Sequence, residues 1–425
     1  MAGAPVVILG TGQGGFQAAA SLREEGFAGR IVLVGEEPDL PYQRPPLSKA
    51  YLAGALDEAM VRLRPKSFYA EHAIGFLPGE RANGIDRAGR RLRLASGGTL
   101  EYDHLVLALG ARPRRLPIPG VELDGVMYLR TLADATALRH RLPLAREVVL
   151  VGAGFIGLEF AAVAAKLGAA VRIVEATGCV MGRVVSPPVS RCFAETHARW
   201  GNRLLFDTGI VRVLGADGRA TGVETVHGEV LPADLVVICI GVVPNVELAA
   251  AAGLATDDGI VVDDHLLTAD PAISAIGDCA RYPSRFADGT TRLESVQNAV
   301  DQARCVAARL AGRPVPYAAV PWFWSDQGEL RLQIAGLTAG HDRAVLRGDP
   351  GEGRFSVFCF RAGRLIGVES VNRPADHMAG RRILAEASEL TPEQAADPGY
   401  DLKAHAAVLK GGRPGKAHSR PQTLS

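Results

Sequence analysis

Two apolar stretches of the chain share one order of strand, turn and helix. Residues 6–9 run into Gly10-Thr-Gly-Gln-Gly-Gly, and residues 148–151 run into Gly152-Ala-Gly-Phe-Ile-Gly. In both, a short apolar run typical of a buried strand meets a glycine-rich turn, and a helix-like pattern follows. A second apolar strand with an acidic residue beyond its end comes next, at 31–36 and at 171–175. The pattern therefore predicts a repeated unit, offset by 142 residues from Gly10 to Gly152.

The pattern changes after residue 318. Alternating apolar and polar positions predict strands, and a helical pattern follows them at about 374–386. This order is typical of a smaller α+β domain. The last residues, 411–425, are polar and rich in glycine and proline, so we predict a disordered tail. The four predicted strands are 330–335, 343–347, 355–361 and 364–371.

Residues 148–165 are nearly all apolar and have about the length of a membrane span. Three glycines and Glu159 interrupt this stretch, however, so a strand, a turn and a helix explain it better. The N-terminus is apolar but carries no basic region, and it reads as a first strand rather than a signal peptide. We therefore expect a soluble protein with no membrane association.

Composition narrows the class further. The chain has 425 residues, of which 48% are hydrophobic and 22% charged, which is typical of a globular protein of two or three domains. The 47 basic and 46 acidic residues leave a net charge of +1, so nothing favours nucleic acid as a partner. Six cysteines are scattered without a CxxC pair, which argues against a redox dithiol or a metal site and fits the cytoplasm.

The repeated glycine turn has a specific physical use. The first glycine makes a tight turn, the second lets the backbone approach a pyrophosphate, and the third lets helix and strand pack closely. The phosphates then lie at the helix N-terminus, where free N–H groups and the positive end of the dipole meet them. The acid beyond the next strand accepts from ribose hydroxyls and repels a 2′-phosphate. Two dinucleotide sites follow, and Glu175 favours NADH over NADPH.

Four further motifs accompany the two units: residues 41–49 (PYQRPPLSK), 268–278 (TADPAISAIGD), 294–298 (ESVQN) and 321–327 (PWFWSDQ). With them the chain resembles the two-dinucleotide flavoproteins related to glutathione reductase. Within that group it is similar to the bacterial NADH:ferredoxin reductases that serve cytochrome P450 and ring-hydroxylating oxygenase systems. One departure is Leu109, where the family commonly has threonine; it puts a hydroxyl contact there in doubt, but not the fold.

The resemblance implies an α/β fold with two Rossmann-like domains and a C-terminal α+β domain. The FAD domain would be discontinuous, at 1–113 and 242–319, with the NADH domain inserted at 114–241. The C-terminal domain, 320–410, would lie over the flavin. We expect a monomer, because electron-transfer encounters need an open flavin face.

The resemblance also implies the cofactor contacts. Asp278 would accept from a ribitol hydroxyl, Arg130 would bind an anionic oxygen, and the Val296 N–H would face the pyrimidine end of the flavin. The full set expected for non-covalent FAD is Gly10, Gly12, Gly14, Gly15, Glu36, Arg44, Lys49, Ala82, Arg130, Asp278 and Val296. The set expected for NADH is Gly152, Gly154, Ile156, Gly157, Glu159, Glu175, Arg183 and Gly241.

Three residues are candidates for the chemistry itself. Glu159 is either an acid in the first helical turn, favoured by the dipole, or the acceptor for the nicotinamide amide. In the second case we expect Glu159 and Lys49 to face each other near the flavin and to reposition when NADH binds. Trp324 is expected at the exposed edge of the flavin, and Trp322 in the core.

The route of the electrons follows from a missing residue. Disulfide reductases of this fold place a cysteine pair just after the first FAD unit, but residues 36–49 contain no cysteine. Electrons must therefore pass from the flavin to an outside acceptor, which the resemblance implies is a [2Fe–2S] ferredoxin. Such ferredoxins are usually acidic, so Arg304 and Arg381 are candidates for a basic docking rim, or else belong to a solvated helix face.

Other readings remain open at this point. A rubredoxin reductase or a dehydroascorbate-radical reductase on the same scaffold would have a similar flavin site. A different class is an NADH-sensing flavoprotein of the apoptosis-inducing-factor type, which would turn over slowly. Acceptor assays separate these readings.

Overall fold

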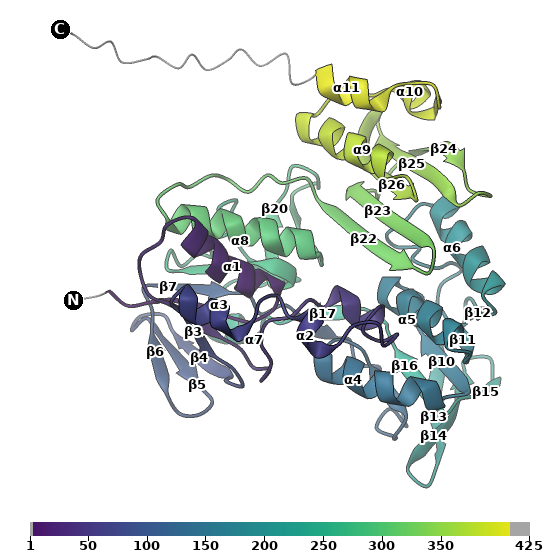
Figure 1. Cartoon of the computed structure of the whole chain (residues 1–425), viewed down its shortest axis with the longest axis horizontal. Coiled ribbons are helices and arrows are strands. Elements are labelled where there is room, and N and C mark those ends of the chain that lie inside the picture. The colour runs from purple at the N-terminus through teal and green to yellow at the C-terminus, as the bar shows by residue number, and fades with distance from the viewer. Residues whose placement is uncertain (1–2, 409–425) are drawn as a thin grey trace.

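The computed structural model describes residues 3–408, in which three five-stranded sheets carry most of the helices (Figure 1). The predicted tail at 411–425 lies outside the described residues. The fold class predicted from the sequence is confirmed, because two of the sheets are parallel with glycine turns at their strand ends and the third is antiparallel.

The first sheet is parallel, with the strand order β19-β7-β1-β2-β3. Its central strands are fully buried apolar runs, as expected where helices cover a parallel sheet. Helices α1 (Gln13–Glu24) and α8 (Val296–Leu310) pack side by side (Figure 1). The strands are β1 (Val6–Leu9), β2 (Ile31–Val34), β3 (Ile74–Leu77), β7 (His104–Leu107) and β19 (Ile273–Ala275).

Short elements surround this sheet. They include two small sheets, three short α-helices and two 3₁₀ turns. The strands are β4 (Ala82–Asp86), β5 (Arg91–Leu94), β6 (Thr99–Glu101), β18 (Ile260–Val261), β20 (Ala280–Pro283) and β21 (Thr290–Thr291). The helical pieces are η1 (Pro45–Ser48), α2 (Glu58–Val61), α3 (Lys66–Glu71), α7 (Glu247–Ala251) and η3 (Gly277–Cys279).

The second sheet repeats the plan of the first, with the order β12-β11-β10-β16-β9. Its strands are β9 (Val126–Tyr128), β10 (Glu147–Val151), β11 (Ala170–Val174), β12 (Arg203–Leu205) and β16 (Leu235–Ile238). The helical elements near it are α4 (Leu132–Arg141), η2 (Leu142–Leu144), α5 (Phe155–Lys166) and α6 (Pro187–Arg199). A small antiparallel sheet of β13 (Ile210–Ala216), β14 (Arg219–Thr225) and β15 (Val230–Pro232) follows β12 along the chain.

The apolar stretch 148–165 is therefore β10, a glycine turn and α5, as its interruptions predicted. In the part of the chain that the structure describes, no helix has both the length and the apolar character needed to cross a membrane.

The chain passes between the two parallel sheets through one narrow ribbon. Strand β8 (Ala111–Pro113) leads toward the second sheet, and β17 (Val242–Pro244) leads back. The two strands pair antiparallel, with Pro113 opposite Val242. Both crossings therefore lie side by side.

The third sheet is antiparallel, with the order β22-β23-β26-β25-β24 and helices against it (Figure 1). The predicted strands and the helix at 374–386 are confirmed, whereas β22, α10 and α11 were not among the predicted elements. The strands are β22 (Trp322–Gln327), β23 (Leu330–Gly336), β24 (Arg343–Asp349), β25 (Arg354–Arg361) and β26 (Arg364–Val371). The helices are α9 (Pro374–Glu386), α10 (Pro392–Ala396) and α11 (Leu402–Val408).

A buried carboxylate fastens the third sheet to the second. Glu369 of β26 accepts hydrogen bonds from the Ser186 N–H at 3.0 Å and from the Ser186 hydroxyl at 2.5 Å. Ser186 is the N-cap residue of α6, so a side chain from another sheet satisfies the helix end. Burial raises the pKa of Glu369, despite the hydrogen bonds from Ser186 that favour the charged form. The contact fixes α6 against the third sheet.

Candidate functional site

Both glycine turns lie at the carboxyl edges of their parallel sheets. The Gly10 N–H donates to the Val34 carbonyl at 2.8 Å, and the Gly152 N–H donates to the Val174 carbonyl at the same distance. Gly10 has a φ of +114° and Gly152 of +99°, a backbone region that favours glycine. The two turns are therefore structural equivalents, and each lies where a sheet of this kind binds its ligand.

The other glycines of the turns differ in what they meet. A Cβ at Gly15 would lie 1.8 Å from the Gly10 oxygen, and a Cβ at Gly157 would lie 2.5 Å from the Gly152 oxygen. These two glycines are needed for helix–strand packing. A Cβ at Gly12 or at Gly154 would have no atom of residues 3–408 within 4 Å, and the φ values there are an ordinary −70° and −79°.

The chain's own packing therefore does not demand glycine at positions 12 and 154. A ligand that came close to the backbone would demand glycine there, which fits the pyrophosphates expected at both turns. Gly12 and Gly154 are also the N-cap residues of α1 and α5, and in the described structure neither helix has a capping side chain or an acid in its first turn. The positive helix ends are thus left for an anion.

The two predicted ribose-binding acids have different surroundings. Glu175 accepts from the Ala153 N–H at 2.8 Å and from the Thr177 N–H at 2.9 Å, so its carboxylate is fixed beside the second glycine turn. The side chain of Glu36 is 71% exposed, with Arg81 at 3.8 Å. Arg172 points away and pairs with Glu147. The Glu175 carboxylate is thus held beside the second turn, where the sequence predicts a ribose.

The predicted contacts to the second half of FAD also gather at one edge. Asp278 follows β19, and its carboxylate lies 3.0 Å from an Nη atom of Arg130. The Arg130 Nε atom is buried and has no partner within residues 3–408. Val296 is the first residue of α8, where an N–H has no intrahelical acceptor. Ser295 caps α8 at the Asn298 N–H, so the N–H of Val296 and the buried Arg130 Nε are the donors that fit the anionic and carbonyl oxygens of a flavin nucleotide.

Gln302 of α8 was not found by sequence reasoning. Its side chain is fully buried, and its oxygen accepts from the Gly277 N–H at 2.7 Å. The amide nitrogen has no partner in the described part of the chain. Gln302 therefore orients the turn that carries Asp278. On the buried face of α8, Asn298 is also polar, so a glutamine there gave no distinct signal in the sequence.

Arg44 is held by the protein itself. One Nη atom donates to Glu37 at 2.6 Å, and the other donates to the Arg130 carbonyl at 2.6 Å. The Tyr42 hydroxyl donates to the same Glu37 carboxylate at 2.5 Å. Glu37 and Tyr42 were also missed, although Tyr42 stands in the motif 41–49. A direct contact of Arg44 with FAD stays a prediction.

The remaining predicted residues lie near the same edges. Ala82 begins β4 at an irregular register, Gly241 follows β16 with a φ of +97°, and Ile156 is 43% exposed beside the second glycine turn. Arg183 is exposed in the loop before α6. Gly14 packs on Ala299 of α8 and serves the contact between the two helices.

Glu159 is where three separate parts of the chain meet. One carboxylate oxygen accepts from the Ser48 hydroxyl at 2.5 Å and lies 2.9 Å from Lys49 Nζ. The other accepts from the Ser325 hydroxyl of β22 at 2.7 Å. The residue is 2% exposed. The predicted pairing of Lys49 with Glu159 is thus present, and Ser48 and Ser325 are partners that the sequence did not reveal.

The simpler interpretation of Glu159 as an acid in the first helical turn is wrong. Helix α5 begins at Phe155, so Glu159 is its fifth residue and lies in the second turn. Its carboxylate is balanced by Lys49 and by hydroxyl donors, not by the helix end. Burying a carboxylate costs much free energy unless it is paired and hydrogen-bonded, and these partners meet that need.

The two tryptophans of the motif 321–327 lie together, with ring centroids 5.5 Å apart. The expectation that Trp322 belongs to the core is wrong, because the residue is only half-buried and the Arg381 guanidinium lies 4.5 Å from its ring centroid. A surface cation on an indole face is a stabilising arrangement. Trp324 is also half-buried.

Arg304 and Arg381 share one acidic neighbour. Asp301 of α8 lies 3.8 Å from Arg304, and both arginines act on its carboxylate electrostatically. Burial nevertheless raises the pKa of Asp301. The structure thus places Arg304 of α8 and Arg381 of α9 around the same carboxylate, with Arg381 also on the ring of Trp322.

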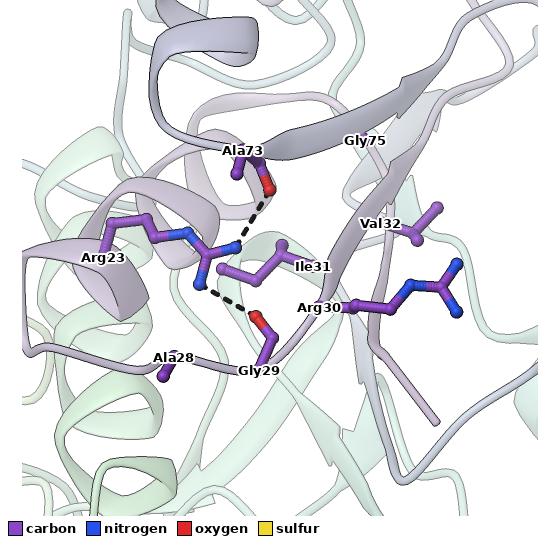
Figure 2. Close-up of a pocket in the computed structure, with 8 residues that line it drawn as sticks. All are labelled: Arg23, Ala28, Gly29, Arg30, Ile31, Val32, Ala73 and Gly75. Carbon is purple, nitrogen blue, oxygen red and sulfur yellow. Dashed lines mark hydrogen bonds between the residues drawn. The ribbon is translucent and has the colours of Figure 1, made fainter. Parts of the chain in front are cut away.

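A cavity of about 260 Å³ lies elsewhere, at the opposite edge of the first sheet (Figure 2). Arg23 reaches into it, and its guanidinium donates to the carbonyls of Gly29 and Ala73, each at 2.9 Å, and of His72 at 2.8 Å. The hydrogen-bond donors of Arg23 are thus taken up by backbone carbonyls of the protein itself. We therefore interpret Arg23 as a structural residue that joins the starts of β2 and β3, and we do not interpret the cavity as a binding site.

Comparison with known proteins gives one consistent result. Residues 4–303 match the family described as pyridine nucleotide-disulphide oxidoreductase, and residues 322–406 match the reductase C-terminal family. The chain is 54% identical over 398 residues to the rhodocoxin reductase of Rhodococcus erythropolis, which covers 94% of this chain and 93% of that protein.

Two solved structures have nearly the same fold. The ferredoxin reductase for the CYP199A2 system from Rhodopseudomonas palustris has a TM-score of 0.93 and 53% identity, over 95% of this chain and 100% of that one. The covalent putidaredoxin reductase–putidaredoxin complex gives a TM-score of 0.94 and 40% identity, over 96% and 100% of the two chains.

Proposed function

Because the chain belongs to the pyridine nucleotide-disulphide oxidoreductase family, and within it to the ferredoxin reductases, we propose that it oxidises NADH and reduces a [2Fe–2S] ferredoxin that supplies a P450 or oxygenase. The resemblance drawn from the four motifs is confirmed, and so are the ferredoxin reductase activity and the cofactors FAD and NAD(P)H. The observation that best supports the proposal is that Gly12 and Gly154, the N-cap residues of α1 and α5, have open space where a Cβ would lie.

The chain's own residues account for most of what such a reductase needs. FAD, when bound, accepts a hydride as an electron pair and passes the electrons on singly. The N-termini of α1 and α5 would bind the two pyrophosphates, and Glu175 would bind the ribose of NADH. A 2′-phosphate beside the fixed Glu175 carboxylate would be repelled, which supports a preference for NADH over NADPH.

Glu159 would orient the nicotinamide. A carboxylate offers about four acceptor sites, and Ser48, Lys49 and Ser325 use three of them. The remaining site, on the oxygen that faces Ser325, would accept from the carboxamide of the nicotinamide. The negative charge would also favour the positive charge that develops on the ring as hydride leaves.

The acceptor would dock on the surface around Arg304, Arg381 and Trp324. An acidic ferredoxin would be attracted to the two arginines, and Trp324 would lie at the face that the ferredoxin covers. A monomer leaves this face free. All six cysteines are unpaired, which supports a reducing compartment such as the cytoplasm.

The proposal is tested by NADH oxidation with cytochrome c as final acceptor, with and without a bacterial [2Fe–2S] ferredoxin. We expect ferredoxin to raise the rate in a saturable way by about tenfold or more, as steered charge-complementary encounters do. Rapid flavin reduction without that increase would point to rubredoxin or a small acceptor. Slow flavin reduction with a long-lived flavin–nicotinamide complex would instead favour the NADH-sensing class.

Charge reversal of the basic surface should separate the two half-reactions. In Arg304→Glu we expect reduction of ferredoxin to fall about tenfold at low ionic strength, with a smaller loss in high salt. Reduction of ferricyanide, which needs no docking surface, should stay unchanged. Steady-state assays with both acceptors measure this.

The matched control is Arg203→Glu, which reverses an exposed arginine in the second sheet whose one ion pair within residues 3–408 is with Glu229. Its activity with both acceptors should match that of the unaltered protein. An equal loss with ferredoxin and ferricyanide in Arg304→Glu would contradict a docking role.

A further inference from the structure

We infer that Ser325, Gln327, His197 and Asn202 are positioning residues for Glu159. They form a buried chain of hydrogen bonds whose donors all point toward that carboxylate. The inference rests on the proposed function and adds residues that neither the motifs nor the family comparison assign. The chain of hydrogen bonds ends at the Glu159 oxygen that keeps an acceptor site for the nicotinamide.

The first link has only one possible direction. The Ser325 hydroxyl lies 2.7 Å from Glu159, and the Gln327 side-chain nitrogen lies 3.2 Å from the Ser325 oxygen. A hydroxyl has a single hydrogen, and an ionised carboxylate only accepts. Ser325 must therefore donate to Glu159 and accept from Gln327.

The next links inherit this direction. With its nitrogen turned to Ser325, Gln327 presents its oxygen to His197 Nε2 at 2.9 Å. His197 Nε2 must then carry the hydrogen, and Nδ1 accepts from the Asn202 side-chain nitrogen at 2.9 Å. Burial lowers the pKa of His197, so the ring is neutral and has one N–H to give.

The reverse arrangement fails at the carboxylate. If Gln327 were flipped, its oxygen would accept the Ser325 hydrogen, and two acceptor oxygens would then face each other at Ser325 and Glu159. The thioether sulfur of Met181 lies 3.9 Å from the Gln327 nitrogen, which also suits a donor at that position. The charge of Glu159 thus sets the tautomer of a histidine several side chains away.

The residues of the hydrogen-bond chain come from three different elements. Ser325 and Gln327 stand on β22, whereas His197 belongs to α6 and Glu159 to α5. Ser325, Gln327 and His197 are 0% exposed, and Asn202 is 4% exposed. In a buried network each bond polarises the next, so four donors in series strengthen the last one.

The consequence for NADH binding is specific to the nicotinamide. Lys49 and Ser48 hold one carboxylate oxygen. Among the residues that the structure describes, Ser325 alone orients the other oxygen, which keeps the acceptor site for the carboxamide. Loss of the Ser325 hydroxyl would free that oxygen to turn away. Binding of the adenosine half of the nucleotide, at the glycine turn and Glu175, does not depend on this chain of hydrogen bonds.

The test measures nucleotide binding to the oxidised FAD-loaded protein by calorimetry. In Ser325→Ala we expect the affinity for NAD⁺ to fall about tenfold, as for loss of a hydrogen bond to a charged group. Affinity for ADP-ribose, which lacks the nicotinamide, should stay unchanged. Ser325→Thr, which keeps the hydroxyl, should retain NAD⁺ affinity. Stopped-flow reduction by NADH should show the same order of variants.

A second variant tests the chain beyond its first link. Gln327→Met keeps the volume and removes both polar atoms, so NAD⁺ affinity should fall about threefold. Added to Ser325→Ala, the same change should have no further effect on NAD⁺, because its influence passes through the missing hydroxyl. If the losses of NAD⁺ affinity in the two single variants added fully in the double variant, Gln327 would not act through Ser325.

The matched control is Ser190→Ala. Ser190 is also a buried serine, 4% exposed, but its hydroxyl donates to the Val180 carbonyl at 2.6 Å. The ratio of NAD⁺ to ADP-ribose affinity should not change in this variant. An unchanged NAD⁺ affinity in Ser325→Ala, or an equal loss for both ligands, would overturn the inference. If the unaltered protein bound no NAD⁺ at all, the proposed function itself would fail.

Discussion

A Gly12→Ser variant is expected to fold but to be purified almost without FAD. Serine is a preferred N-cap residue, the φ at Gly12 is ordinary, and no described atom lies where its Cβ would stand, so the free protein should keep its stability. The side chain would occupy the space through which the pyrophosphate approaches the N–H groups of α1. Loss of two such hydrogen bonds corresponds to about a hundredfold weaker binding.

The measurement compares the flavin absorbance of the purified variant, its circular dichroism and its FAD affinity after reconstitution. Gly154→Ser is the matched control, because Gly154 has the same geometry at the start of α5. That variant should keep its FAD but should be reduced by NADH only at much higher concentrations. A yellow Gly12→Ser protein with full FAD affinity would show that the cofactor does not approach α1 at this position.

Glu159→Gln is expected to slow flavin reduction or to raise the KM for NADH by about tenfold to a hundredfold, the effect of losing a charged acceptor. Glutamine keeps the volume but has one oxygen, whereas Ser48, Lys49 and Ser325 offer donors to both oxygens. Its NH₂ group would face a donor and leave a buried bond unmade. The charge that favours the oxidised nicotinamide would also be lost.

Anaerobic stopped-flow absorbance of the flavin, over a range of NADH concentrations, separates the rate from the affinity. Ferredoxin and ferricyanide should be affected equally, since both depend on flavin reduction, in contrast to Arg304→Glu. The control is Glu101→Gln, which removes an exposed carboxylate paired with Arg91 at 3.2 Å. Unchanged rate and KM in Glu159→Gln would exclude a role for Glu159 at the nicotinamide.

The repeated unit could be predicted from the sequence because its features are local. A buried strand, the glycine turn and the helix after it lie within one short stretch of the chain, from Val6 to Glu24 in the first unit and from Glu147 to Lys166 in the second. The acid after the next strand follows from the parallel order of the sheet. The structure agrees with the roles expected for these glycines, since Gly15 and Gly157 pack closely against the strand turn, whereas a Cβ at Gly12 or Gly154 would stand in open space among residues 3–408.

The surroundings of Glu159 could not be predicted in this way. Ser48 and Ser325 come from positions 111 and 166 residues away in the sequence. Both stand inside motifs that the sequence analysis singled out, but a motif does not state which neighbour a hydroxyl meets. The helix start at Phe155 also depends on the turn geometry, and a shift of one turn changed the meaning of Glu159.

Arg44 and Trp322 show a different limit. Sequence reasoning placed Trp322 in the core, which is wrong, and Arg44 at the flavin, which stays a prediction, but it found the protein partners of neither side chain. In the structure Glu37 and the Arg130 carbonyl hold Arg44, and Arg381 covers a half-buried Trp322. Charged groups choose partners by proximity in space, which neither periodicity nor composition encodes.

The narrow ribbon of β8 and β17 has a consequence for how such a protein can be rearranged. All strands of the second sheet lie within residues 126–238, and all strands of the first lie outside this range. Pro113 and Val242 are register partners, so the inserted segment starts and ends about 5 Å apart, the spacing of paired strands. A short turn could join these two residues without moving a strand of the first sheet. The inserted segment could therefore be replaced as a unit, and a different nucleotide-binding domain could be joined to the rest of the protein at the same two strands.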